Sequence, residues 1–252
     1  MPTFFIQHSV PADEDTIRIT GADRRHMKDV LRMKSGEDVQ INDSAGWRYD
    51  CRLQSYGDAD AVLKILGRFP GDTDPRYEIT VYQGLPKSDK MDSIIQKCTE
   101  LGASRIVPVV CARSVVRFRD EGDAGRKIQR WAKIAKEAAK QSGRNRIPVV
   151  DGPLSLGEAA AEAAMADVRF LAWECEDGRT VRQVLRDDEG RTVHEVRSVA
   201  FLIGPEGGFD AAEVETARKA GLLTATLGKR ILRTETAAPA VLAMLMYEFE
   251  MA

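Results

Sequence analysis

Short apolar runs alternate with longer segments of helical periodicity from residue 77 onward, and this alternation limits the fold more than any other feature of the 252-residue chain. The runs expected to form strands are residues 79–82, 105–110, 168–173, 199–203 and 224–227. The segments expected to form helices are residues 89–101, 124–142, 156–165, 211–220 and 239–249. Strands joined through helices pair in parallel, and a parallel sheet needs helices on both faces. The pattern therefore predicts an α/β fold with a mostly parallel sheet.

The helix expected at residues 211–220 has signals at both ends. Asp210 suits the N-cap, and Glu213 stands at the position that completes a capping box. Gly221 follows the last helical residue, where glycine commonly ends a helix.

A different pattern precedes this region. Residues 38–66 alternate apolar and polar side chains between turn residues, which predicts short strands in a small β-rich unit. The Pro-, Gly- and Asp-rich segment 67–75 then separates the two patterns. We expect an N-terminal domain at residues 1–70 and a larger domain at residues 76–252.

Composition narrows the class of function. The 37 Lys and Arg residues and 39 Asp and Glu residues give a net charge of −2, so nucleic-acid binding would have to rest on local basic patches. The 4 cysteines form no C-x-x-C pair and the 3 histidines form no metal-binding motif, so we expect free thiols and no metal. We also expect no membrane span and no secretory signal, which favours a cytoplasmic location.

Two blocks near the C-terminus predict one pocket. Residues 201–208 (FLIGPEGG) and 227–237 (LGKRILRTETA) each open from an apolar run into a glycine-containing loop, where α/β proteins place ligand sites. The first block lacks both common phosphate-binding motifs, and its Glu206 would repel phosphate, so it favours a ligand with positive charge. The second block carries closely spaced basic residues and suits a polyanion. The first block alone is more often a tight turn than a cofactor loop.

The two blocks together, with Arg-x-Glu-Thr-Ala at residues 233–237, resemble the SPOUT superfamily of knotted RNA methyltransferases, and specifically the ribosomal RNA small subunit methyltransferase E family. Residues 84–87 (GLPK) and a motif that begins at His26 match the same family. The resemblance implies a SPOUT-type trefoil-knotted sheet with a small N-terminal PUA-like β-barrel domain that binds RNA. Knots are nearly absent among folds, so only the resemblance supports this one.

The resemblance also implies that the cofactor is S-adenosyl-L-methionine. The residues expected to line its site are Ile203, Gly204, Gly207 and Gly208 from the first block, and Leu227, Gly228, Ile231, Leu232 and Ala237 from the second. Glycines allow close backbone approach, and aliphatic side chains can clasp the adenine ring. For Ile231 and Leu232, ordinary core packing is an equal alternative. Glu174 is a candidate for a third wall.

The reaction implied by the resemblance is methylation of N3 of a uridine in 16S ribosomal RNA. The N3–H group is weakly acidic, so the site needs a proton acceptor or a cation that stabilises the developing negative charge. We expect Arg233 to face the uracil oxygens, and Glu235 either to orient Arg233 or to accept the proton. Glu206 is a second candidate base. Alternatively, Glu235 serves only as a carboxylate near the start of the helix that contains Pro239.

Basic segments are candidate RNA contacts. Residues 126–144 place several Lys and Arg residues in one stripe at helical spacing, although a solvated helix face is the alternative. The basic side chains expected to contact RNA are Arg24, Arg25, His26, Arg32, Lys87, Arg126, Arg130, Lys133 and Arg144. The implied partner is 16S ribosomal RNA or the small ribosomal subunit.

Residues 241–247 are apolar nearly all round, so the terminal helix should be buried either in the core or between two subunits. SPOUT enzymes are usually homodimers, and the resemblance favours a homodimer here. Two other functions stay open: methylation of a ribose 2′-OH, as in other SPOUT members, and a non-catalytic role in RNA binding or ribosome assembly. The intact glycines of both blocks argue against the non-catalytic role.

Overall fold

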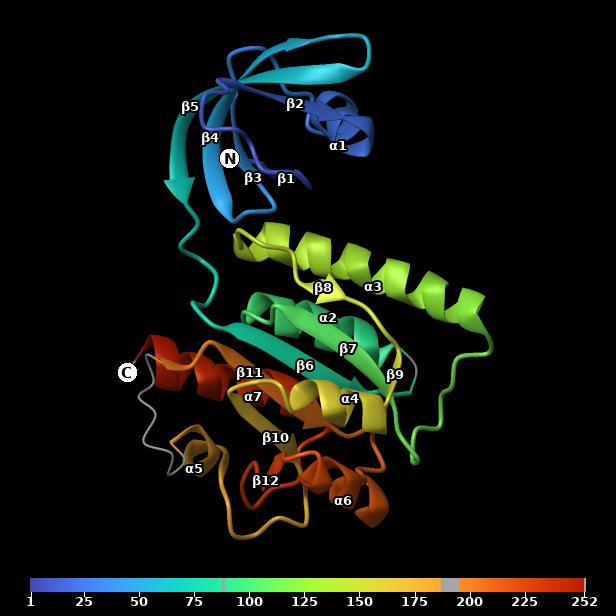
Figure 1. Cartoon of the computed structure of the whole chain (residues 1–252). Helices are drawn as coiled ribbons and strands as arrows, with labels where there is room; N and C mark the ends of the chain where they lie inside the picture. The colour runs from blue at the N-terminus through green and yellow to red at the C-terminus, as the bar shows by residue number, and fades with distance from the viewer. Residues whose placement is uncertain (88, 187–194, 252) are drawn as a thin grey trace. The chain divides into compact units, whose positions relative to one another are not determined.

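The structure is a computed structural model that describes residues 1–87, 89–186 and 195–251 (Figure 1). The chain forms two compact units. The first consists of Met1–Asp74 and Lys140–Arg146, and the second of Pro75–Ala139 and Ile147–Ala252. A short segment from the middle of the chain therefore packs with the N-terminal strands.

The first unit is built around a five-stranded sheet in the order β1-β3-β4-β5-β2. The strands are β1 (Thr3–Phe5), β2 (Thr16–Thr20), β3 (Asp38–Asn42), β4 (Trp47–Tyr56) and β5 (Asp60–Pro70). β1 pairs with β3 in parallel, and the other pairs are antiparallel. The helical segments α1 (Gly21–Arg25) and η1 (His26–Val30) follow β2. Alternate residues of β4, among them Tyr49 and Leu53, are buried in the core of the unit, as their period-two pattern predicts.

The second unit contains a parallel sheet in the order β12-β10-β11-β6-β7-β8, with β9 also paired to β7. Its strands are β6 (Glu78–Gly84), β7 (Arg105–Val110), β8 (Val149–Val150), β9 (Leu154–Ser155), β10 (Val168–Ala172), β11 (Ser198–Ile203) and β12 (Leu223–Ala225). The predicted parallel α/β sheet is confirmed. Strands β8 and β9 have no signal in the sequence, because two residues are too few to show periodicity.

Helices cover both faces of this sheet (Figure 1). On one face lie α2 (Lys90–Glu100), α3 (Glu121–Ser142), α5 (Val181–Leu185) and α7 (Thr234–Glu250). On the other face lie α4 (Leu156–Ala163) and α6 (Ala211–Lys219). Successive residues of β11 point to opposite faces, so Phe201 packs in the first layer while Ala200 and Leu202 pack in the second. The rings of Phe201 and Phe170 stack with centroids 5.7 Å apart.

The ends of two helices test the local signals in the sequence. The Asp210 side chain accepts a hydrogen bond from the backbone of Glu213, and Gly221 has a φ of +95°, so the predicted cap and stop of α6 are confirmed. The predicted start of the last helix near Pro239 is wrong, because α7 begins at Thr234. Pro239 removes one backbone hydrogen bond and its ring crowds the carbonyl of Glu235, and burial of the apolar face of the helix offsets this cost.

The carboxyl ends of β6, β10, β11 and β12 lie at the same edge of the sheet because the strands are parallel. A buried hydrogen-bond chain joins three of the segments that leave this edge. Gln83 Nε2 donates to Thr234 Oγ1 over 2.8 Å, and Thr234 Oγ1 donates to the Gly204 carbonyl over 2.7 Å. The end of β6, the loop after β11 and the start of α7 are thereby fixed to one another.

We predict that Phe201→Ala lowers the free energy of unfolding by about 3–5 kcal/mol, because it removes a fully buried ring and leaves a cavity against Phe170. Urea unfolding followed by circular dichroism measures the change. Met165→Ala is the control, since the Met165 side chain is exposed and its truncation should change stability by less than about 0.5 kcal/mol. Equal effects of the two substitutions would contradict the assignment of Phe201 to the core.

Candidate active site

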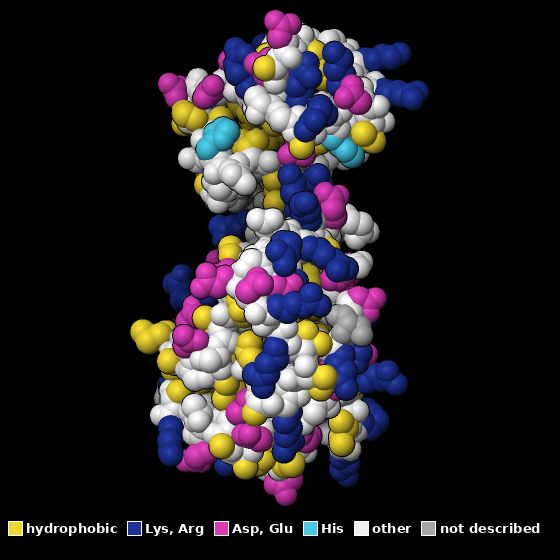
Figure 2. Space-filling view, turned by 90° about the vertical axis from the view of Figure 1, so that its right-hand side faces the viewer, with side chains coloured by type: hydrophobic (Ala, Val, Ile, Leu, Met, Phe, Trp, Pro, Cys, Tyr) yellow, Lys and Arg dark blue, Asp and Glu magenta, His cyan; other side chains and the backbone are white. Residues whose placement is uncertain are grey.

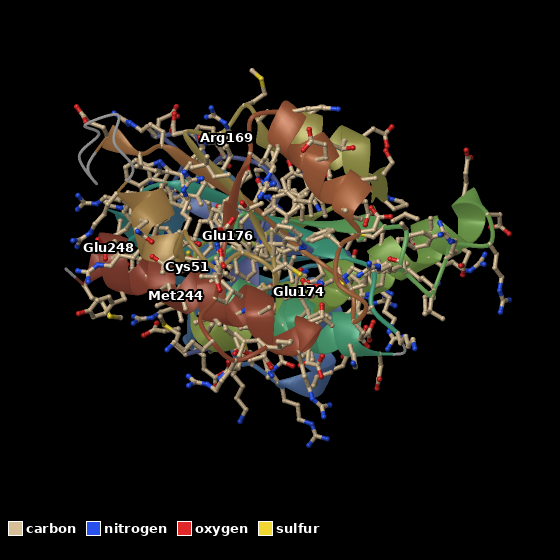
Figure 3. The ribbon with its side chains drawn as sticks, turned by 90° about the horizontal axis from the view of Figure 1, so that it is seen from below. Cys51, Arg169, Glu174, Glu176, Met244 and Glu248 are labelled. Carbon is tan, nitrogen blue, oxygen red and sulfur yellow. The ribbon has the colours of Figure 1, made fainter. Side chains whose placement is uncertain are left out.

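A cavity of about 960 Å³ lies at the carboxyl edge of the parallel sheet, among the segments that follow β10, β11 and β12. It brings together every residue that the sequence analysis assigned to cofactor binding or catalysis. These residues are Ile203, Gly204, Glu206, Gly207, Gly208, Leu227, Gly228, Ile231, Leu232, Arg233, Glu235 and Ala237. Glu174 also lines the cavity and forms part of the expected third wall; Figure 3 labels it together with Glu176, on the segment after β10.

The loop after β11 needs glycine at two positions. A Cβ atom on Gly204 would lie 3.1 Å from the backbone of Gly208. Gly208 has a φ of +67°, and a Cβ atom there would lie 2.2 Å from the Glu174 carboxylate. At Gly207 the nearest atoms belong to the Arg113 side chain, at 3.1 Å and beyond. Gly204 and Gly208 therefore close the turn, through a backbone contact and a left-handed conformation respectively, whereas the equally close neighbour of Gly207 is a side-chain atom of Arg113.

The loop after β12 is more open. Gly228 has a φ of +106°, which favours glycine, and nothing lies within 4 Å of the place of a Cβ atom. Leu232 packs partly against the core, whereas Ile231 is 86% exposed at the cavity. Ordinary core packing therefore does not explain Ile231. An exposed β-branched side chain on a cavity wall is well placed to close over an apolar ligand surface.

Lys90 links the two carboxylates of the cavity, and the sequence analysis did not include it in the site. Its Nζ atom lies 3.0 Å from Glu206 Oε1 and 3.4 Å from Glu235 Oε2. The backbone N–H of Lys87 also donates to Glu206 over 3.0 Å. Lys90 belongs to the first turn of α2, directly after the segment that leaves β6. Only the pairing of β6 with β11 brings it to Glu206, and that pairing has no signal in the sequence.

The charges in this cluster are mutually stabilised. Burial by itself would raise the pKa of Glu206, but hydrogen bonds from Lys90 and from backbone N–H groups hold it below its ordinary value. The pKa of Glu235 is lowered chiefly by its own backbone N–H and, against the effect of burial, by Lys90. The pKa of Lys90 is raised, chiefly by Glu206. All three groups are therefore charged at neutral pH, and each carboxylate is a weaker base than an ordinary one.

Arg233 points into the open part of the cavity. Its side chain is 82% exposed, and its Nη1 atom lies 3.9 Å from Glu235 Oε1. This distance allows attraction but leaves the guanidinium able to bind a ligand. Glu235 Oε2 is buried and accepts no hydrogen bond from the residues that the structure describes, although Lys90 stands nearby. Arg233 therefore keeps hydrogen-bonding capacity for a ligand, whereas the buried Oε2 atom of Glu235 faces Lys90.

The basic residues of the first unit differ in availability. Arg25, His26 and Arg32 are exposed. Arg24 is partly committed to the structure, since it donates to the Asp60 carbonyl over 3.1 Å and to the Gly57 carbonyl over 2.8 Å. Figure 2 shows that the Lys and Arg side chains on its face are mixed with Asp and Glu, which agrees with a net charge near zero.

The stripe predicted on α3 is shorter in the structure. Arg126 and Lys133 are exposed, and Arg130 forms an ion pair with Asp92 while staying largely exposed. The prediction of Arg144 as a surface contact is wrong, because Arg144 is 4% exposed and pairs with Asp74 over 2.6 Å. The helix ends at Ser142, so the helical spacing that placed Arg144 on the stripe no longer applies there.

Comparison with known proteins identifies the family. A family model described as an RNA methyltransferase domain matches residues 73–246, and one described as an RNA methyltransferase PUA domain matches residues 19–66. The ribosomal RNA small subunit methyltransferase E of Bacillus subtilis (strain 168) is 34% identical over 100% of this chain and 98% of its own length. The chain belongs to the ribosomal RNA small subunit methyltransferase E family.

Solved structures agree with this assignment. A ribosomal RNA small subunit methyltransferase E from Neisseria gonorrhoeae bound to S-adenosyl methionine is 30% identical, with a TM-score of 0.82 over 98% of this chain and 97% of that one. A putative methyltransferase from Legionella pneumophila in complex with the same cofactor is 26% identical, with a TM-score of 0.81 over 97% and 96% of the two chains. Both similarities include the N-terminal sheet and the parallel sheet of this family member.

We predict that Lys90→Met raises the pKa of Glu206 and Glu235, which share Lys90 as their cation. Carboxyl groups whose pKa is lowered in the folded state add stability above their ordinary pKa of 4.5, and that contribution is lost as pH falls through the folded-state value. The wild type should therefore melt at a higher temperature than Lys90→Met at pH 7, and the difference should shrink as the pH falls below 4.5.

Lys97→Met is the matched control, because Lys97 is an exposed lysine of the same helix. Thermal melts of the three proteins between pH 3 and pH 8 measure the effect. A difference between wild type and Lys90→Met that did not change with pH would show that Lys90 acts through packing and not through the two carboxylates.

Proposed function

We propose that this chain methylates N3 of a uridine in 16S ribosomal RNA and uses S-adenosyl-L-methionine as the methyl donor. The observation that carries the proposal is the cavity at the carboxyl edge, where two glycine-containing loops, two charged carboxylates and an exposed arginine meet. The names of the similar proteins supply the substrate class, small-subunit ribosomal RNA, and the cofactor. The N3 position comes from the family resemblance.

The cavity suits the cofactor in size and charge. Its volume of about 960 Å³ falls at the upper end of the range of small-molecule sites. The closed turn at Gly204 and Gly208 keeps side chains away from the loop surface, and Leu227 and Ile231 add apolar walls. Acidic side chains, including Glu174, favour a ligand that carries positive charge. When bound, the cofactor would supply a methyl group on a positively charged sulfur.

The residues of the chain would manage the charge on the uracil. As N3 loses its proton, negative charge spreads onto the ring oxygens, and the exposed Arg233 can donate hydrogen bonds to them. The proton would pass to solvent water, and transfer of the methyl group to N3 would leave the ring neutral and the donor as an uncharged thioether. The lowered pKa values of Glu235 and Glu206 favour roles in orienting Arg233 and Lys90 over acceptance of the proton.

RNA would bind through the exposed basic residues of both units. These residues are Arg25, His26, Arg32, Lys87, Arg126, Arg130 and Lys133, with Arg24 in a smaller role. We assign residues 1–70 to a PUA-like RNA-binding domain and residues 76–252 to the methyltransferase domain, whose basic residues add to the RNA contact. We further propose that the C-terminal loops form a trefoil knot and that the protein is cytoplasmic. Among the described residues, none of the helices has the length and apolar content of a membrane span.

A homodimer is part of the proposal. The inner side of α7 is buried as expected, with Val241 and Leu245 fully covered. Its outer side, however, leaves Met244 partly exposed and Tyr247 67% exposed. An apolar helix face at the surface is typical of a contact between subunits, so it supports burial of this helix between two subunits.

The test of the proposed activity is methyl transfer to small ribosomal subunits from a strain that lacks the gene, followed by nucleoside mass spectrometry and mapping of the modified base. We expect 3-methyluridine. A 2′-O-methyl nucleoside would assign the chain to the ribose-methylating alternative. No transfer, together with no cofactor binding in calorimetry, would favour the non-catalytic role.

We predict that Gly208→Ala weakens S-adenosylmethionine binding by tenfold or more, a change of about 1.4 kcal/mol. The turn requires a left-handed backbone at residue 208, which alanine disfavours, and the new methyl group would displace the Glu174 carboxylate. Gly207→Ala is the comparison within the same loop, since residue 207 has no left-handed backbone and its methyl group would meet only Arg113, whose Cβ atom lies 3.1 Å away. Calorimetric titration of the folded variants measures both. Equal affinities would remove the turn from the cofactor site.

We predict that Arg233→Ala slows methyl transfer roughly a hundredfold to a thousandfold, or about 2.7–4 kcal/mol, with little change in cofactor affinity. Single-turnover rates at saturating cofactor and RNA measure the loss. Glu235→Gln serves as the comparison: if Glu235 accepts the proton, high pH should restore part of its rate, whereas Arg233→Ala should recover less. Full activity of Arg233→Ala would exclude the electrostatic role.

A further inference from the structure

A second cavity, of about 900 Å³, lies beside α5 and the end of α6 in the larger unit. Four arginines line it: Arg179, Arg182, Arg186 and Arg218. Thr180 and Glu176 line both this cavity and the one at the carboxyl edge, so the two cavities share a wall. Neither the family resemblance nor the proposed methyl transfer assigns a role to these arginines.

The positive charge of this cavity is not neutralised by its own wall. Among the described residues of the lining, Glu176 is the only acidic one, and its oxygens accept hydrogen bonds from Thr224 Oγ1 and from the backbone N–H groups of Gly178 and Arg179. Arg218 lies 3.8 Å from this carboxylate. The lining therefore holds more guanidinium groups than carboxylates.

Two of the arginines are uncommitted. Arg186 pairs with Glu248, and Arg218 donates to Thr224 over 3.1 Å. The side chains of Arg179 and Arg182 form no hydrogen bond or ion pair with the residues that the structure describes. Uncommitted guanidinium groups bind phosphate well, because they can donate two parallel hydrogen bonds to it.

The backbone holds these arginines in place next to the other cavity. Thr180 and Gln183 form a capping box that fixes the start of α5. The backbone N–H of Thr226 donates to the Arg179 carbonyl over 2.8 Å, and Thr226 lies in the loop that lines the cavity at the carboxyl edge. The segment that carries Arg179 and Arg182 is therefore attached directly to the loop after β12, which lines the other cavity.

We propose that the arginine-lined cavity binds backbone phosphates of the substrate RNA, next to the nucleotide that is methylated. This proposal rests on the proposed function, because it has one RNA strand run from the site of methyl transfer across the shared wall into the arginine-lined cavity. A strand that places a base near Arg233 carries phosphates on both sides of that base, and the arginines offer them a positive surface adjoining the cavity at the carboxyl edge. The cavity would fix the register of the strand without reading its sequence.

The test is the double variant Arg179→Ala/Arg182→Ala, compared with Arg76→Ala/Arg197→Ala. The control removes two exposed arginines from the same unit, outside the linings of both cavities, so the net charge changes equally. Binding to small-subunit ribosomal RNA is measured across salt concentrations. We expect the Arg179/Arg182 variant to bind at least tenfold more weakly at low salt, with a log–log salt slope smaller by about one unit per lost contact.

Cofactor affinity and melting temperature of the Arg179/Arg182 variant should equal those of the wild type, which separates this site from the cofactor site and from a folding defect. A slope and affinity like those of the control would overturn the proposal while leaving methyl transfer by the wild type intact. Failure of the proposed function would instead appear in the wild type itself, as absent cofactor binding or absent transfer. If a mononucleotide bound to the wild type as tightly as RNA does, and the Arg179/Arg182 variant no longer bound it, the cavity would instead be a site for a small anion.

Discussion

The parallel pairing of β10 with β11 and β12, and of β11 with β6, is the constraint on which the site depends. Parallel pairing places the carboxyl ends of these strands at one edge, although the segments that leave them are far apart in the sequence. The buried bonds from Gln83 to Thr234 and from Thr234 to the Gly204 carbonyl then hold those segments at fixed distances. Without this pairing, the glycine-containing loops would not face one cavity.

Lys90 shows how electrostatic interactions fix the charged side chains that the sheet brings together. One cation stands between two carboxylates, and each carboxylate is ionised because the cation and backbone N–H groups stabilise it. A group stabilised in its charged form is a poor proton acceptor at neutral pH, so the cluster is better suited to positioning than to base catalysis. The exposed Arg233 is the charged side chain of the cluster that is most available to bind a ligand.

The sequence predicted what depends on local pattern. Apolar runs and helical spacing located the principal strands and helices of the second unit, period-two alternation located strands of the first, and the cap at Asp210 fixed the start of α6. Glycine content indicated the turn at Gly204 and Gly208, but not that Gly208 needs a left-handed backbone. Lys90 was missed because its role depends on β6 lying beside β11, which is a long-range pairing. Arg144 was misplaced because helical spacing was extended beyond the end of α3.

The two neighbouring cavities explain how a chain with a net charge of −2 could bind a positively charged cofactor and a polyanion at once. Such a protein has no overall field that attracts RNA, so selectivity must come from groups within about one Debye length, roughly 8 Å at physiological salt. The cavity at the carboxyl edge is lined by both signs of charge, with Glu206 and Glu235 beside Lys90, whereas Arg179 and Arg182 give the other cavity its basic character. Glu176 in the shared wall stays ionised, because the hydrogen bond from Thr224 and those from backbone N–H groups hold its pKa below the ordinary value, so it forms a negative boundary between the arginines and the cavity at the carboxyl edge.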